Sequence, residues 1–142
     1  MATYQIITDS CCDFTRRQFE ENRVLCVPLT VVWDGIAHDN FSEAADVKAF
    51  YDILRSGTQA TTSAANPETW AKVMEPALQE GKDLLVMGFT SALSATYQSL
   101  VIAAEDLREK YPQRKINIVD TLCAALGQGL LVWYACKKRD EG

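Results

Sequence analysis

The sequence LLVMGFTSALSAT, residues 84–96, places four hydroxyl side chains directly after a continuous apolar run. Continuous apolar runs of this kind are typical of strands that are covered on both faces of a sheet. The stretch that follows has apolar residues at helical spacing, which predicts a helix that Pro112 ends. The residues of this apolar stripe are Leu93, Tyr97, Leu100, Val101, Ala104 and Leu107. The sequence therefore predicts a strand, a hydroxyl-rich turn and a helix in succession.

Three further apolar runs predict strands, and helical patterns separate them. These runs are YQIIT (residues 4–8), VLCVPLTVVW (24–33) and INIVD (116–120). Strands that alternate with helices imply right-handed crossovers and a parallel sheet. We therefore expect a single α/β domain over residues 1–142, with a parallel β-sheet of about four strands and helices on both faces. Pro28 in the second run favours an edge position or a bulge.

A helix is predicted from Ser42, as N-cap, to a residue just before Gly57. Its apolar residues recur at i, i+3, i+4 and i+7, which predicts a face that packs in the core. They are Val47, Phe50, Tyr51 and Leu54. The next segment, TQATTSAAN (residues 58–66), has no periodicity and predicts a polar loop.

Another helix is predicted after this loop, with Asn66 as N-cap and Pro67 at its first position. Its apolar residues Trp70, Val73 and Leu78 would face the core. Pro76 predicts a kink or a split near the end of this helix, because proline removes a backbone donor.

Hydroxyl and carboxylate side chains follow three of the predicted strands. They are TDS at residues 8–10, TSALS at 90–94, and Asp120-Thr121. In a parallel sheet the carboxyl ends of the strands meet at one edge, where ligands normally bind. Each of these hydroxyls can be an ordinary helix cap. Four hydroxyls in seven residues exceed what one cap requires, and beside helix N-termini they could form a small neutral site for a carboxylate or a phosphate.

Composition and motif content exclude several classes of function. The net charge is −5, and the only basic cluster is Lys137-Lys138-Arg139, so a nucleic-acid surface is not favoured. Five cysteines without a CxxC pair, and a single histidine, favour neither a disulfide framework nor a metal site. The lone His38 argues against a Ser-His-Asp hydrolase, and no phosphate-binding glycine loop is complete. The sequence lacks a signal peptide and a membrane span, so we expect a cytoplasmic protein.

Taken in order, these motifs resemble those of the DegV family of bacterial fatty-acid-binding proteins. The resemblance runs along the whole chain and rests on the order and spacing of the motifs. They are TDS with Asp13-Phe14, VPLTVVWDG, AFYDIL, TTS with NPE, FTSALSATYQS, and IVDT. Members of this family are two-lobed α/β proteins of roughly twice this length. The chain therefore resembles the N-terminal lobe, with the C-terminal lobe absent.

The resemblance implies a site for a long-chain fatty acid, with no cofactor, no metal and no catalytic residue. Thr62 and Ser63 in one segment, and Ser91 and Ser94 in the other, would hold the carboxylate. Further rim candidates are Asp9, Ser10 and Asp120. Ala95 departs from the family pattern, since it stands where members typically have glycine.

The resemblance also implies the role of a carrier rather than an enzyme. A separate ATP-binding subunit of fatty acid kinase would phosphorylate the acid that this chain presents. An alternative from another class is an enzyme or a phosphotransferase component that binds the phosphate of a small metabolite at the same rim. A third interpretation is a structural fragment without a ligand, since a half-protein would lack the other wall of the tunnel. If the tunnel for the acyl chain lies between two lobes, this half exposes an apolar face, which predicts self-association.

Overall fold

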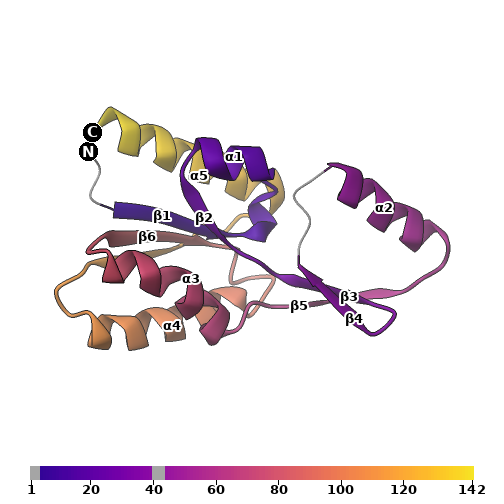
Figure 1. Cartoon of the computed structure of the whole chain (residues 1–142), viewed down its shortest axis with the longest axis horizontal. Coiled ribbons are helices and arrows are strands. Elements are labelled where there is room, and N and C mark those ends of the chain that lie inside the picture. Colours follow the sequence, from indigo (N-terminus) through magenta and orange to yellow (C-terminus); the bar gives the residue numbers. More distant parts are fainter. Residues whose placement is uncertain (1–3, 40–43) are drawn as a thin grey trace.

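A four-stranded parallel sheet forms the centre of the computed structural model, which describes residues 4–39 and 44–142 (Figure 1). The strand order is β2-β1-β6-β7, and every neighbouring pair is parallel. Its strands are β1 (Tyr4–Asp9), β2 (Val24–Val27), β6 (Asp83–Gly88) and β7 (Ile116–Asp120). The predicted α/β class and the predicted parallel sheet are therefore confirmed.

Helices cover both faces of this sheet, as the alternating pattern predicted. One face packs against α3 (Pro67–Gln79) and α4 (Thr96–Lys110) through a core that includes Trp70, Met74 and Leu100. The other face packs against the short helix η1 (Ser10–Cys12) and α5 (Ala125–Glu141), and α1 (Arg16–Glu21) lies on the same side (Figure 1). The two cores keep water away from both faces, which is why the strands read as continuous apolar runs.

The ends of α3 follow the sequence signals, but its proline does not split it. The Asn66 side chain accepts a hydrogen bond from the Thr69 N–H at 2.8 Å, which confirms the predicted N-cap. Pro76 lies in a continuous helix that ends at Gln79, so the predicted split is wrong. In α4 the stripe of Leu100, Ala104 and Leu107 is buried, whereas Leu93 precedes the helix and is 72% exposed.

The predicted strand 24–33 is two strands in two different sheets. Residues after Val27 leave the parallel sheet, and Thr30–Trp33 forms β3 of a three-stranded antiparallel sheet in the order β4-β3-β5. The break falls at Pro28, which has no N–H to donate, and the next N–H, of Leu29, donates to the Ser10 hydroxyl at 2.9 Å. The apolar run concealed this break because both strands are rich in β-branched residues.

The other two strands of this second sheet were missed in the sequence. β4 (Ile36–Asp39) pairs with β3 through the two-residue turn Asp34-Gly35, in which both residues have positive φ. This is the backbone of a type I′ hairpin, for which Asp-Gly is a favoured sequence. β5 (Ala60–Ser63) lies where a loop was predicted, and its pairing with β3 overrides its weak periodicity.

The helix α2 (Ala44–Arg55) lies beside the second sheet, away from the core of the parallel sheet (Figure 1). Its apolar stripe does not pack in that core, so the predicted core face is wrong: Val47 is 37% exposed and Tyr51 is 52% exposed. Phe50 instead contacts Trp33 of β3, with ring centroids 5.4 Å apart. The N-cap predicted at Ser42 lies outside the described residues.

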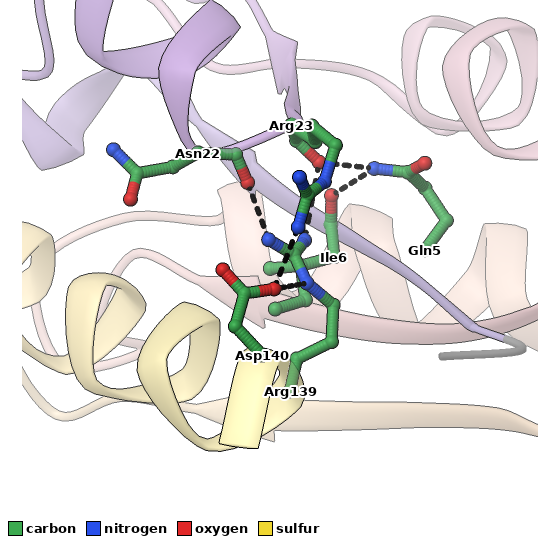
Figure 2. Close-up of polar contacts among 6 residues, drawn as sticks. All are labelled: Gln5, Ile6, Asn22, Arg23, Arg139 and Asp140. Carbon is green, nitrogen blue, oxygen red and sulfur yellow. Dashed lines mark hydrogen bonds and ion pairs between the residues drawn. The ribbon is translucent and has the colours of Figure 1, made fainter. Parts of the chain in front are cut away.

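The buried face of α5 carries two polar side chains, Gln128 near its start and Arg139 near its end. Figure 2 shows the Arg139 guanidinium in the turn after α1, where it donates to the carbonyls of Asn22 at 2.8 Å and Arg23 at 3.4 Å. Asp140 accepts from Arg139 at 3.0 Å and from Arg23 at 2.6 Å. Carbonyls at a helix end carry partial negative charge, so this arginine fastens the end of α5 to the end of α1.

The opposite face of α5 is apolar and exposed. Leu126, Leu130 and Tyr134 are each more than half exposed, and Trp133 is 39% exposed. Lys137 of the same helix places its Nζ 5.1 Å from the centroid of the Trp133 ring, and the other three side chains stay more than half exposed. The self-association that we inferred from an uncovered apolar face stays a prediction.

The close approach of α5 to η1 requires glycine at position 129. A Cβ at Gly129 would lie 2.5 Å from the Cys12 carbonyl oxygen, whereas a Cβ at Gly127 would meet only the Cys123 Cβ, at 3.8 Å. We expect Gly129→Ala to lower the free energy of unfolding by about 1–3 kcal/mol, because the helix must move away. Gly127→Ala should raise it by up to about 1 kcal/mol through helix propensity. Urea unfolding measures both, and equal effects would contradict this account.

Candidate functional site

Three strand ends meet at the carboxyl edge of the parallel sheet. β1, β6 and β7 run parallel and end at Asp9, Gly88 and Asp120, so TDS, TSALS and Asp120-Thr121 lie on one edge, as predicted. Thr121 joins two of these ends, because its hydroxyl donates to the Gly88 carbonyl at 2.8 Å. This edge is the expected position for a ligand in an α/β sheet.

Asp9 lies beneath this edge rather than on its surface. Its carboxylate is fully buried and accepts hydrogen bonds from the N–H groups of Cys11 at 3.0 Å and Phe89 at 2.7 Å. The Gln128 amide donates to it at 3.1 Å. Burial raises the pKa of Asp9 above its ordinary value, although the hydrogen bonds from Phe89, Gln128 and Cys11 oppose that rise. Because three donors already occupy its oxygens, Asp9 holds the edge together.

Gln128 is a polar residue of this edge that the sequence analysis missed. Besides Asp9, its amide donates to the Thr8 hydroxyl at 3.0 Å, and Thr8 donates to the Met87 carbonyl at 2.7 Å. Its Oε1 is buried without a hydrogen-bond partner among the described residues. No local pattern in the sequence marks Gln128, because its partners Thr8 and Asp9 lie about 120 residues away along the chain.

The segment 89–95, here called the rim loop, uses most of its own backbone donors. Phe89 donates to Asp9, and Thr90 donates to the Cys123 carbonyl at 3.1 Å. The N–H groups of Ser91, Ala92 and Leu93 also have protein acceptors. Those of Ser94 and Ala95 have no acceptor among the described residues. The rim loop therefore offers an anion mainly hydroxyl groups and these two N–H groups.

The hydroxyls of Ser94 and Thr96 form a pair at the start of α4. Their oxygens are 2.9 Å apart, and the Thr96 N–H donates to the Ser94 oxygen at 3.1 Å. If Thr96, which is fully buried, also gives its hydroxyl proton to Ser94, the half-buried Ser94 hydroxyl keeps its own proton for a ligand. The N-cap of α4 is Ala95, which has no side-chain cap, and the Ser94 hydroxyl before it accepts the first N–H of the helix and can also donate a hydrogen bond.

Ser91 and Asp120 lie together on the other side of the rim loop. The Asp120 carboxylate accepts from the N–H groups of Ser91 at 3.2 Å and Leu122 at 3.1 Å. Burial acts to raise the pKa of Asp120, but hydrogen bonds from Ser91 and Leu122 outweigh it and hold the pKa below its ordinary value. Asp120 is therefore anionic at neutral pH, which disfavours an anion close to Ser91 relative to one close to Ser94.

Thr62 and Ser63 belong to β5, and strand geometry directs their side chains to opposite faces of the second sheet. Thr62 pairs with Val31, whose other neighbour is His38, and Ser63 pairs with Thr30. Thr30 directly follows Leu29, which is hydrogen-bonded to Ser10 at the end of β1. The register therefore brings both residues to the end of the second sheet that is nearer the carboxyl edge.

The remaining candidate, Ser10, is buried, and its hydroxyl accepts the Leu29 N–H. Burial raises the pKa of the nearby Cys11 and Cys12 thiols to about 12, so neither is a ready nucleophile. Within residues 4–39 and 44–142 no group of three or more histidine, cysteine or acidic side chains could hold a metal ion. No helix in the same residues has the length and apolar character to cross a membrane.

Two leucines give the hydroxyl rim an apolar border. Leu93, in the rim loop, is 72% exposed, and Leu122, after β7, is 73% exposed. Leu122 also has a φ of 52°, a left-handed conformation that is strained for leucine, and its N–H is held by Asp120. Backbone strain of this kind clusters at functional sites. Hydroxyl donors beside exposed leucines suit an amphiphilic ligand.

Comparison with known proteins decides the family. A family model described as an uncharacterised protein of the DegV family matches residues 3–142. The chain belongs to the DegV family. A DegV domain-containing protein of Clostridium perfringens is 38% identical over 143 residues, which cover 100% of this chain and 49% of that protein. The chain thus spans about half the length of the relatives that it matches.

Solved structures of the DegV family have the same fold. A DegV family protein from Thermus thermophilus, whose structure is described as showing fatty acid binding, superposes with a TM-score of 0.84 at 32% identity. That match covers 99% of this chain and 48% of the other. A stearic acid-binding protein from Eubacterium ventriosum superposes with a TM-score of 0.87 at 25% identity, over 98% of this chain and 48% of the other.

The two carboxylates of the edge should titrate on opposite sides of the ordinary Asp value. We expect a carboxyl ¹³C titration to place the midpoint of Asp9 above 3.8 and that of Asp120 below it. Because the folded-state pKa of Asp9 is raised, its contribution to stability is lost as pH rises from 3.8 through that pKa. The contribution of Asp120 is present above 3.8 and is lost as pH falls through its lowered pKa. Coincident midpoints would contradict the assignment of Asp9 to the buried position.

Proposed function

We propose that this chain is the carboxylate-holding lobe of a cytoplasmic fatty-acid carrier without catalytic activity of its own. The observation that carries the proposal is the hydroxyl rim at the carboxyl edge, bordered by the exposed Leu93 and Leu122. A long-chain fatty acid has the matching chemistry, with one anionic head and an apolar tail. Fatty acid binding by relatives of known structure supports the same ligand class.

In this proposal the head group is held by neutral donors. The hydroxyls of Ser94 and Thr62 donate to the carboxylate, with Ser91 and Ser63 at the periphery. Hydrogen bonds to a charged group contribute about 1.5–3 kcal/mol, without the desolvation of a buried counter-charge. The tail contributes about 0.8 kcal/mol for each buried CH₂ group, so it supplies most of the affinity and the rim sets the orientation.

The carrier would present its carboxylate to a separate ATP-binding kinase subunit. Family resemblance supports this step, and so does the chemistry of the edge, because none of its carboxylates is placed to act as a general base for a bound acid. Asp9 is buried under three donors, and Asp120 is engaged by two N–H groups. Because both carboxylates are already hydrogen-bonded in this way, the edge gives no support to the alternative of an enzyme acting on a phosphorylated metabolite.

Ligand identity can be tested by native mass spectrometry of the chain after bacterial expression. A retained acid of about C14 to C18 supports the carrier, because each buried CH₂ group contributes roughly 0.8 kcal/mol and a long tail is therefore held through purification. A phosphorylated metabolite on the chain would support the enzyme instead. If nothing is retained, the chain is titrated with palmitate and with hexadecanol, which has no carboxylate. Tighter binding of palmitate shows a weak carboxylate site, and no binding of either shows that the site is absent.

Ser94→Ala should weaken fatty acid binding by roughly 1–3 kcal/mol, because it removes a hydroxyl donor to a charged group. Ser99→Ala, one turn further along α4, is the matched control and should bind like the wild type. Isothermal titration with palmitate below its critical micelle concentration measures both variants. Equal binding by Ser94→Ala and Ser99→Ala would remove Ser94 from the site.

A further inference from the structure

Gln128 occupies a buried position in which its amide donors are used and its acceptor is not. Its side chain is fully buried on the face of α5 that packs against the sheet, and its Oε1 lacks a partner among the described residues. An unpaired buried acceptor destabilises the folded state, whereas the amide N–H groups satisfy the buried Asp9 carboxylate and the Thr8 hydroxyl, which an apolar side chain of the same length could not do. Its two amide donors are therefore the property that distinguishes it from such a side chain.

Both donors lead to the strand ends that carry the rim loop. One Nε2 hydrogen bond reaches Asp9, which accepts the Phe89 N–H at 2.7 Å. The other reaches Thr8, which donates to the Met87 carbonyl at 2.7 Å. Met87 and Phe89 flank the last residue of β6, and the rim loop starts at Phe89. Gln128 is thus linked through one intervening residue, Thr8 or Asp9, to both neighbours of Gly88, the residue at which the rim loop leaves the sheet.

Gln128 is also held firmly enough to transmit this geometry. Gly129 allows the α5 backbone to lie against the Cys12 carbonyl, where even a Cβ would approach to 2.5 Å. Arg139 fastens the far end of the same helix face to the turn after α1 (Figure 2). α5 therefore presents the amide from a fixed position, which a binding site needs of the residues that support it.

We propose that Gln128 is a positioning residue of the carboxylate site: through Asp9 and Thr8 it fixes the start of the rim loop and hence the placement of Ser91 and Ser94. This role rests on the proposed function, since a rim that binds no carboxylate has no need of a set geometry. It adds α5 to the elements on which the site depends.

Gln128→Met keeps the length and volume of the side chain but removes both donors. We expect affinity for palmitate to fall about tenfold, which is within the range that outer-shell hydrogen-bond partners contribute to binding sites. The urea midpoint should also fall, because the buried Asp9 carboxylate loses one of its donors, so affinity is compared without urea, where the variants are folded. Unchanged affinity would overturn the proposal.

Arg139→Met is the matched control on the same helix face. It removes hydrogen bonds to the Asn22 and Arg23 carbonyls, which lie at the opposite end of α5. It should lower the urea midpoint and leave the affinity of the folded protein for palmitate unchanged. Loss of affinity in both variants, in proportion to their loss of stability, would reduce Gln128 to a structural role.

Two readouts without ligand separate this proposal from the proposed function. In Gln128→Met the amide hydrogen exchange of Phe89 should speed up by about tenfold, since its acceptor Asp9 has lost a support. The titration midpoint of Asp9 should rise further, because the Gln128 hydrogen bond lowers its pKa. The other titratable groups that interact with Asp9, namely Cys11, Cys12 and Cys26, are unchanged.

The combined outcomes are distinguishable. If the wild type binds no fatty acid but the Phe89 exchange and the Asp9 titration both shift in Gln128→Met, the positioning of the rim loop stands and the proposed ligand is wrong. If the wild type binds palmitate and Phe89 exchange is unaffected by Gln128→Met, the ligand stands and the positioning role is overturned.

Discussion

The carboxylate of Asp9, buried without a counter-charge, is the constraint on which the ligand edge depends. A carboxylate in this position is costly unless donors surround it, and here the donors come from η1, the first residue of the rim loop and α5. Each donor group belongs to a different element, so satisfying one side chain fixes three parts of the fold relative to one another. The hydrogen bonds that make the burial of Asp9 possible are therefore the same ones that hold the edge together.

This arrangement determines which chemistry remains for a ligand. The N–H groups at the start of the rim loop are committed to Asp9, Asp120 and neighbouring carbonyls, so the loop offers few backbone donors. Hydroxyls therefore become the main donors, and Ser94 is half-buried at the start of α4, where its oxygen accepts the Thr96 N–H. The anionic Asp120 biases the anion away from Ser91. Neutral hydroxyl donors of this kind suit a carboxylate whose affinity comes from its tail.

The parallel sheet could be predicted because its strands are continuous apolar runs separated by helical patterns, and such runs require cover on both faces. The second sheet could not, for two physical reasons. Pro28 interrupts a run whose composition is equally suitable for both strands, and Ala60–Ser63 is a strand only because it pairs with β3. The Asp34-Gly35 turn was recognisable, but the hairpin it forms was not inferred from it.

The candidate site, like the fold, could be predicted from the sequence only in part. The edge with TDS, TSALS and Asp120-Thr121 followed from the parallel topology, whereas the burial of Asp9 and Ser10 beneath it depends on packing that no local pattern reports. Gln128 was invisible because its partners, Thr8 and Asp9, lie about 120 residues away. The order of the motifs was sufficient to predict the family. Which motif residues are buried and which remain for a ligand depends on long-range hydrogen bonds.

The most direct test of the central claim, that neutral hydroxyls of this edge hold a carboxylate, is the titration of carboxyl-¹³C palmitic acid bound to the chain. Hydrogen bonds from Ser94 and its neighbours favour the ionised form, so the bound acid should titrate at a lower pH than the same acid in detergent micelles. Its carboxyl carbon should also show contacts to Ser94 protons. A bound acid that titrates as it does in micelles, without contacts to the rim loop, would contradict the account.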